Sequence, residues 1–136
     1  KLIEDFHLIF KDGKVVDYDA KTEKEALKNL LEMDDGSSRL GEVALISHSS
    51  PISDMNILFY NTLFDENASC HLALGASYPM NLKGGVQLSD EELKNKGGNV
   101  SLTHVDFMFG SSDMTITGLK ANCEKVIIFK EGNFVF

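Results

Sequence analysis

The 136-residue chain is long enough to bury one sizeable core, and 43% of its residues are hydrophobic, as is usual for a globular domain. Its formal net charge of −8 argues against nucleic acid and an anionic membrane surface as partners, because both are bound by basic side chains. No apolar run approaches the roughly 20 residues of a transmembrane helix, and two cysteines are too few for a disulfide framework, so we expect a reduced, cytoplasmic protein.

The first elements expected along the chain are a hairpin and a helix. An Asp-Gly pair at 12–13 predicts a tight turn between two strands. These strands cover residues 2–10 and 14–18. Thr22 followed by Glu25 has the pattern of a capping box, which predicts that a helix begins there and ends at 34–36.

The remaining elements are short. The run 40–46 is apolar at both parities, which predicts a strand covered on both faces. Ser89 and Glu92 form a second capping-box pattern, which predicts a short helix. The other expected elements are a helix near 55–60, a turn at 65–67, a strand within 101–110, and a meander of 114–119, 125–130 and 133–136 that turns at 131–132. Short strands dominate and two or three short helices intervene, so the predicted class is α+β with a mixed, largely antiparallel sheet.

The strand at 101–110 carries the first candidate site. Side chains alternate across a strand, so His104 and Asp106 share one face while Val105, Phe107 and Phe109 share the other, which is apolar and can be buried. The imidazole and the carboxylate then lie about 7 Å apart along the strand. Such a pair can ligate a divalent metal ion.

Two further segments carry ligand-type residues in apolar surroundings. Glu42 is the one acid in its apolar run, and His71 enters another apolar stretch that is followed by Tyr78. A carboxylate in such surroundings is costly unless a cation or hydrogen bonds compensate. Together with His104 and Asp106, these residues supply the mixed nitrogen and oxygen ligands of a catalytic zinc or cobalt site.

The segments that hold these residues resemble a known family. Leu-Gly-Glu-Val at 40–43, the long run at 58–75, Tyr-Pro at 78–79 and Thr-His-Val-Asp-Phe-Met at 103–108 are similar to the C-terminal part of the thermophilic metalloaminopeptidases, which include aminopeptidases T and S of bacteria. The resemblance implies hydrolysis of the N-terminal bond of peptides by two divalent metal ions, zinc or cobalt, in a homodimer.

The resemblance also implies roles for individual residues. Tyr78 is expected to act in catalysis, either as a metal ligand or as a hydrogen-bond donor to the developing oxyanion. The implied metal ligands are Glu42, His71, Tyr78, His104 and Asp106. Asp65 and Glu66 are candidates for the general base or for binding the substrate's ammonium group, or else belong to a solvated turn.

One departure from the family pattern shapes the expectations for the isolated chain. The family has a further glutamate ligand in a Pro-Thr-Glu-Glu-like segment that this sequence lacks, and its members carry an N-terminal α/β domain. We therefore expect residues 1–136 to be the C-terminal metal-binding domain of a two-domain enzyme, inactive by itself. The alternatives are a non-catalytic module for dimerisation and substrate enclosure, and a thiol hydrolase that uses Cys70 with His71 or His104.

Overall fold

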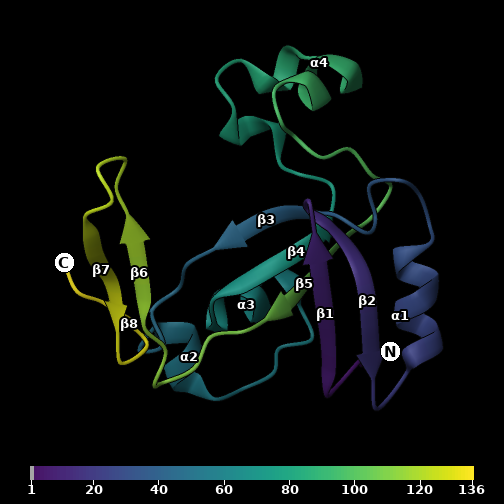
Figure 1. Ribbon diagram of the computed structural model, residues 1–136. Coiled ribbons are helices and arrows are strands. Elements are labelled where there is room, and N and C mark those ends of the chain that lie inside the picture. The colour runs from purple at the N-terminus through teal and green to yellow at the C-terminus, as the bar shows by residue number, and fades with distance from the viewer. Residues whose placement is uncertain (1) are drawn as a thin grey trace. The chain divides into compact units, whose positions relative to one another are not determined.

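The structure, a computed structural model, describes residues 2–136 and combines short helices with small antiparallel sheets (Figure 1). The strands pair in the orders β1-β2, β3-β4-β5 and β6-β7-β8. The predicted α+β class is therefore confirmed. No helix among the described residues has the length and apolar character needed to span a membrane.

The described chain divides into two compact units. The first contains the residues up to Glu42 together with Ala73–Val105, and the second contains Val43–Leu72 and Asp106–Phe136. In the first unit the buried apolar side chains come from the hairpin, α1, β4 and α4, and in the second from the residue just before β4 and from β7. They are Val15, Ala20, Leu27, Leu31, Ala73, Leu74 and Leu93 in the first unit, and Cys70 and Phe129 in the second.

The first unit opens with the predicted hairpin. Strand β1 (Phe6–Lys11) pairs with β2 (Lys14–Ala20) in antiparallel register. Asp12 and Gly13 both have positive φ, 51° and 74°, as a two-residue hairpin turn of the primed type requires. Strand β1 begins later than the sequence pattern predicted.

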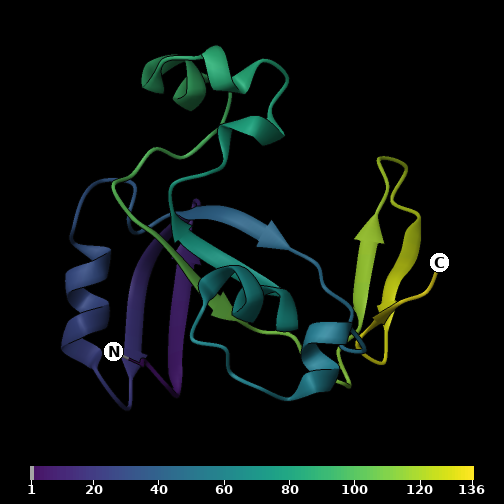
Figure 2. The same cartoon turned by 180° about the vertical axis from the view of Figure 1, so that it is seen from behind.

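Helix α1 (Lys24–Leu31) buries Leu27 and Leu31 and lies beside β2 in both views (Figures 1 and 2). The capping box predicted at its start is wrong. Glu23 occupies the N-cap position with φ of 55° and makes no side-chain capping bond. The Thr22 hydroxyl instead accepts a hydrogen bond from the Glu4 backbone N–H at 3.1 Å. The Thr22 oxygen, which would have capped the helix, is therefore used in a contact with a residue distant in sequence.

The sheet that carries the candidate residues consists of β3 (Leu40–Ala44), β4 (His71–Gly75) and β5 (His104–Met108). Strand β4 is central and is the best buried of the three. Two expectations about burial are wrong for the chain by itself. Val43 on the edge strand β3 is 65% exposed, and Val105 and Phe109, on the apolar face of the 101–110 segment, are 40% and 41% exposed.

The segment between β3 and β4 departs from the sequence prediction. It holds α2 (Pro51–Met55), which Ser50 caps, and α3 (Thr62–Asp65). The helix predicted near 55–60 is wrong, because α2 ends at Asn56 in a left-handed conformation and Tyr60 also has a positive φ, 55°. Three 3₁₀ turns complete the connections of the sheet strands: Glu66–Ala68, Pro79–Asn81 and Gly85–Gln87.

Helix α4 (Asp90–Asn95) has the predicted capping box. The Ser89 hydroxyl accepts the Glu92 N–H at 3.4 Å, and the Glu92 carboxylate accepts the Ser89 N–H at 2.8 Å. Both reciprocal bonds satisfy backbone donors that the helix leaves open.

The C-terminal meander is also confirmed. It consists of β6 (Ile116–Leu119), β7 (Lys125–Lys130) and β8 (Asn133–Phe134), which lie together in both views (Figure 2). Glu131 and Gly132 form the tight turn with φ of 51° and 72°. The fully buried Phe129 ring packs against Phe134 at 4.2 Å between centroids, which fixes this turn against the sheet.

A group of hydrogen bonds around Asp34 connects the loop after α1 to the segment before β5. The Asp34 carboxylate accepts the Gly36 and Ser37 backbone N–H groups, each at 2.8 Å, within its own turn. It also accepts the Leu102 N–H at 2.6 Å and the Ser101 hydroxyl at 2.9 Å. The Leu102 bond contributes most to holding the pKa of Asp34 below its ordinary value of 3.8, with Ser101, Gly36 and Ser37 acting in the same direction and burial opposing them.

This lowered pKa predicts a defined acid sensitivity. A carboxyl whose pKa is depressed by folding adds stability that is complete above its unfolded pKa and is lost as pH falls through its folded pKa. We expect the contribution of Asp34 to the free energy of unfolding to decline as pH falls below 3.8. Urea titrations followed by circular dichroism at several pH values should show a shallower acid decline for Asp34→Asn. A decline equal to that of the unsubstituted chain would contradict this assignment.

Candidate metal centre

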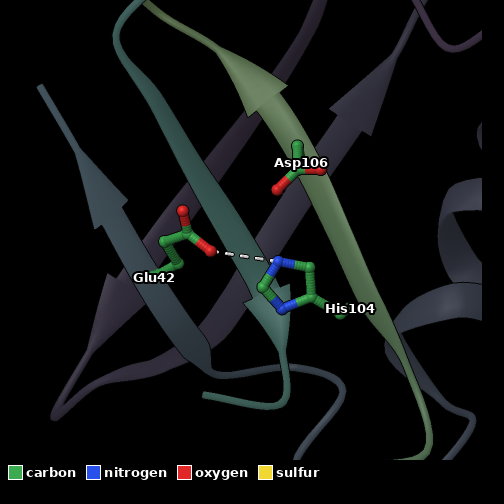
Figure 3. A group of neighbouring side chains, drawn as sticks. All are labelled: Glu42, His104 and Asp106. Atoms are coloured by element: carbon green, nitrogen blue, oxygen red, sulfur yellow. Dashed lines mark ion pairs between the residues drawn. The ribbon is translucent and has the colours of Figure 1, made fainter. Parts of the chain in front are cut away.

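Glu42 and His104 form the centre of the candidate site. Glu42 lies in the middle of β3 and His104 begins β5, and both belong to the first unit. The His104 Nε2 atom lies 3.1 Å from Glu42 Oε2, and the two side chains are 20% and 21% exposed (Figure 3). A charged group at this depth interacts more strongly with a cation than it would at the open surface.

The other ring nitrogen of His104 is fixed by the backbone. Nδ1 lies 2.7 Å from the Ala76 carbonyl oxygen, and the Ala76 N–H donates to the Thr103 carbonyl at 2.7 Å. A carbonyl oxygen can only accept, so Nδ1 carries the proton and Nε2 of the neutral ring keeps its lone pair. This is the arrangement in which a histidine serves as a metal ligand through Nε2.

Asp106 completes the group. It lies two residues beyond His104 on β5, so the alternation of the strand places both side chains on one face, as the sequence predicted (Figure 3). Glu42, His104 and Asp106 each offer a ligand atom, and these atoms all lie within 4.8 Å of one another. All three side chains are partly buried.

The geometry fits a divalent ion. Two ligand atoms held about 2.1 Å from one ion at angles of 90–110° are about 3.0–3.4 Å apart, which matches the Glu42–His104 pair at 3.1 Å. A lone pair on Nε2 facing a carboxylate oxygen is repulsive unless a cation, either a proton or a metal ion, balances it. One imidazole and two carboxylates are also a ligand set that zinc and related ions accept.

The two remaining predicted ligands are Tyr78, which contacts the His104 ring, and His71, which begins the central strand β4. The Tyr78 ring packs against the His104 ring with centroids 4.8 Å apart and is 44% exposed. His71 begins β4, is 2% exposed, and its Nδ1 lies 3.0 Å from the Ser69 carbonyl oxygen. Among the described residues, His71 is not one of the three grouped side chains, and a tyrosine oxygen does not enter that grouping, so the roles of His71 and Tyr78 as ligands stay predictions.

Two glycines allow the strands to approach closely beside the candidate ligands Glu42 and His104. A Cβ at Gly41, next to Glu42, would collide with the Gly75 carbonyl oxygen. A Cβ at Gly75 would collide with the Thr103 carbonyl oxygen, and Gly75 also has φ of +102°, which side chains disfavour. Backbone contact between the strands therefore sets the spacing of Glu42 and His104.

The features behind the alternative readings have structural roles. The Cys70 side chain is fully buried, and its Sγ is 3.2 Å from both the N–H and the carbonyl of Ile46, which is the environment of an inert thiol. The Asp65 carboxylate accepts the backbone N–H groups of Phe59 and Asn61 at 2.8 and 2.9 Å. It therefore stabilises the turn at the start of α3.

The fold and this group of side chains define an α+β chain whose strands bring an imidazole and two carboxylates together as a candidate site for a divalent metal ion. The chain belongs to the thermophilic metalloprotease (M29) family, whose model matches residues 1–134. The family resemblance predicted from the sequence is thereby confirmed.

Known relatives match almost the whole chain. It is 56% identical to Aminopeptidase 2 of Geobacillus stearothermophilus over 99% of its length, and 55% identical to Aminopeptidase AmpS of Bacillus subtilis. The solved structure of wild-type AmpT from Thermus thermophilus superposes with a TM-score of 0.88 at 40% identity, covering 98% of this chain and 32% of that one. The chain spans about a third of the length of the curated relatives it matches.

The groups that orient the candidate ligands were not predicted from the sequence. The carbonyl of Ala76 holds His104, but a backbone carbonyl leaves no trace in residue type. Asp34 and Asn99 do stand out as polar residues that flank glycines, at 36 and at 97–98, and this pattern could have indicated turns that hold strands in place.

Proposed function

We propose that this chain is the C-terminal metal-binding domain of a two-metal aminopeptidase, and that Glu42, His104 and Asp106 are among the metal ligands. The observation that carries the proposal is the 3.1 Å approach of His104 Nε2 to Glu42 Oε2 with Nδ1 already engaged. Peptides are the substrate class, as the aminopeptidase names of the relatives suggest.

The metal ions, zinc or cobalt, would polarise the scissile carbonyl and supply an activated water at neutral pH. The residues of this chain would bind the metal ions and orient the side chains that hold them. Glu42 and Asp106 contribute negative charge that balances the cations, and the Ala76 carbonyl keeps the proton of His104 away from the ligating nitrogen. Tyr78, whose ring contacts the His104 ring, is proposed to ligate a metal ion or to donate a hydrogen bond to the oxyanion. His71 is proposed as a further ligand on the family resemblance.

The proposal extends to the assembly and its location. A homodimer in the cytoplasm is the form that the family resemblance and the low cysteine count favour. A carboxylate ligand from outside these 136 residues completes the proposed two-ion site, so the isolated chain is expected to lack peptidase activity.

The test compares the isolated chain with a chimera in which it replaces the equivalent third of Aminopeptidase 2 of Geobacillus stearothermophilus. With excess cobalt, the chimera should release N-terminal residues from short peptides and lose this activity with EDTA, whereas the isolated chain should release none. The chimera with Glu42→Gln is the matched inactive control.

Two results would contradict the proposal. Peptide release by the chimera that survives EDTA but stops with a thiol-alkylating agent would favour the Cys70 hydrolase reading. Full activity of the Glu42→Gln chimera would leave this domain a non-catalytic module for dimerisation and substrate enclosure.

A further inference from the structure

Glu42 and His104 stand on strands that do not pair with each other, because β4 lies between β3 and β5. The interactions that fix the separation of Glu42 and His104 must therefore act across β4 or around its end. The three strands start or finish near the same loops, namely the segments around 34–39, 75–77 and 99–103. All of these segments belong to the first unit.

Asp34 makes a direct link between the two segments that lead into the ligand strands. On one side its carboxylate holds the Gly36 and Ser37 N–H groups, and the Arg39 N–H then donates to the Gly36 carbonyl at 3.0 Å, just before β3 begins. On the other side it holds the Leu102 N–H at 2.6 Å, two residues before His104.

The link continues from Asp34 to the His104 ring through short steps. The Ser101 hydroxyl, which donates to Asp34, accepts the Thr103 N–H at 3.1 Å. The Thr103 carbonyl accepts the Ala76 N–H at 2.7 Å, and the Ala76 carbonyl accepts the His104 Nδ1–H at 2.7 Å. Each group in this series of hydrogen bonds, from Asp34 to the His104 ring, is therefore bonded to the next.

Asn99 reinforces the same link from the side. Its amide donates to the Gly36 carbonyl at 2.8 Å and to the Gly75 carbonyl at 2.6 Å, and so connects the turn before β3 to the end of β4. Ser37, which also bonds to Asp34, is fully buried. A partly buried carboxylate that is fully engaged by donors is a rigid anchor, because releasing any of those donors is costly.

We propose that Asp34 is a positioning residue that fixes the separation of Glu42 and His104 and the orientation of the His104 ring. The inference rests on the proposed function in that these two side chains are metal ligands. Asp34 itself lies outside the metal site and acts through the backbone of 36–39 and 101–103. Loss of such an outer partner typically weakens metal affinity by about 10–100-fold.

The test uses the whole 136-residue chain with Asp34→Asn, which keeps the shape of the side chain but turns an amide toward backbone donors. Asp35→Asn is the matched control, since it removes the same charge from the exposed neighbouring residue. Leu93→Ala, in the core around α4, is the control for loss of stability alone. The first readout is Co²⁺ affinity from the visible absorption of the bound ion, measured where circular dichroism shows each variant folded.

The second readout needs no metal. Nitrogen-15 spectra of the histidine rings report which nitrogen carries the proton, and His104 should be protonated at Nδ1 in the unsubstituted chain. We expect Asp34→Asn to lower Co²⁺ affinity at least about 10-fold and to mix the two proton positions of His104, whereas both controls change neither.

The outcomes separate this inference from the proposed function. Unchanged affinity and an unchanged His104 spectrum in Asp34→Asn would overturn the inference, and so would an equal loss of affinity in Leu93→Ala. If the unsubstituted chain binds no Co²⁺, the metal function of this chain fails. The His104 spectrum then decides alone whether Asp34 positions the ring.

Discussion

Replacing His104 by alanine is expected to lower the affinity of the chain for Co²⁺ by at least about 100-fold, because a ligand lost directly costs more than the 10–100-fold of an outer partner. The fold should survive, since the ring is 20% exposed and the hydrogen bond to Ala76 that is lost with it is worth about 1 kcal/mol. Isothermal titration calorimetry with Co²⁺ and circular dichroism on the same samples measure both effects.

His7→Ala is the matched control for this experiment. His7 is an exposed residue of β1, so its removal takes away the same imidazole without touching the candidate site. We expect the control to bind Co²⁺ like the unsubstituted chain. Equal affinities for the His104 and His7 variants would remove His104 from the site.

Replacing Gly75 by alanine is expected to destabilise the chain by about 3 kcal/mol and to lower its melting temperature by ~10 °C. The added Cβ would collide with the Thr103 carbonyl oxygen, and the φ of +102° is unfavourable for any residue with a Cβ. The strand end must then move, and it would take the backbone next to His104 with it.

Gly97→Ala provides a close comparison. Gly97 also has a positive φ, +89°, but a Cβ there would meet no atom within 4 Å. It therefore reports the backbone cost alone, and Gly75→Ala should exceed it by the cost of the collision. Thermal unfolding of both variants measures the difference. Equal losses of stability would mean that close approach of the backbone at Gly75 does not set the sheet geometry.

The parts of the fold that local rules govern were predictable from the sequence. The Asp-Gly turn at 12–13, the capping box at Ser89 and the turn at 131–132 each depend on residues a few positions apart, and all three are present. The capping box at Thr22 failed because a residue distant in sequence, Glu4, uses its hydroxyl. The helix near 55–60 failed because its apolar residues lack the caps and backbone conformations that a helix needs there.

The candidate site was predictable in part for the same reason. Strand alternation alone places His104 and Asp106 on one face, and the isolated acid in an apolar run identified Glu42 as costly without a cation. The relative position of β3 and β5 depends on hydrogen bonds that Asp34 accepts and Asn99 donates, and on contacts that only glycine allows. These are tertiary interactions, and residue type indicates at most the turns from which they are made.

Anomalous scattering of zinc, measured in crystals of this chain grown with excess zinc, shows directly whether Glu42, His104 and Asp106 bind a metal ion. We expect an anomalous peak about 2.0–2.2 Å from His104 Nε2 and from a carboxylate oxygen of Glu42 or Asp106. The peak should disappear in the Glu42→Gln variant. Zinc bound elsewhere, with His104 and Glu42 still in contact at about their present distance and no peak between or beside them, would contradict the assignment of this group as a metal centre.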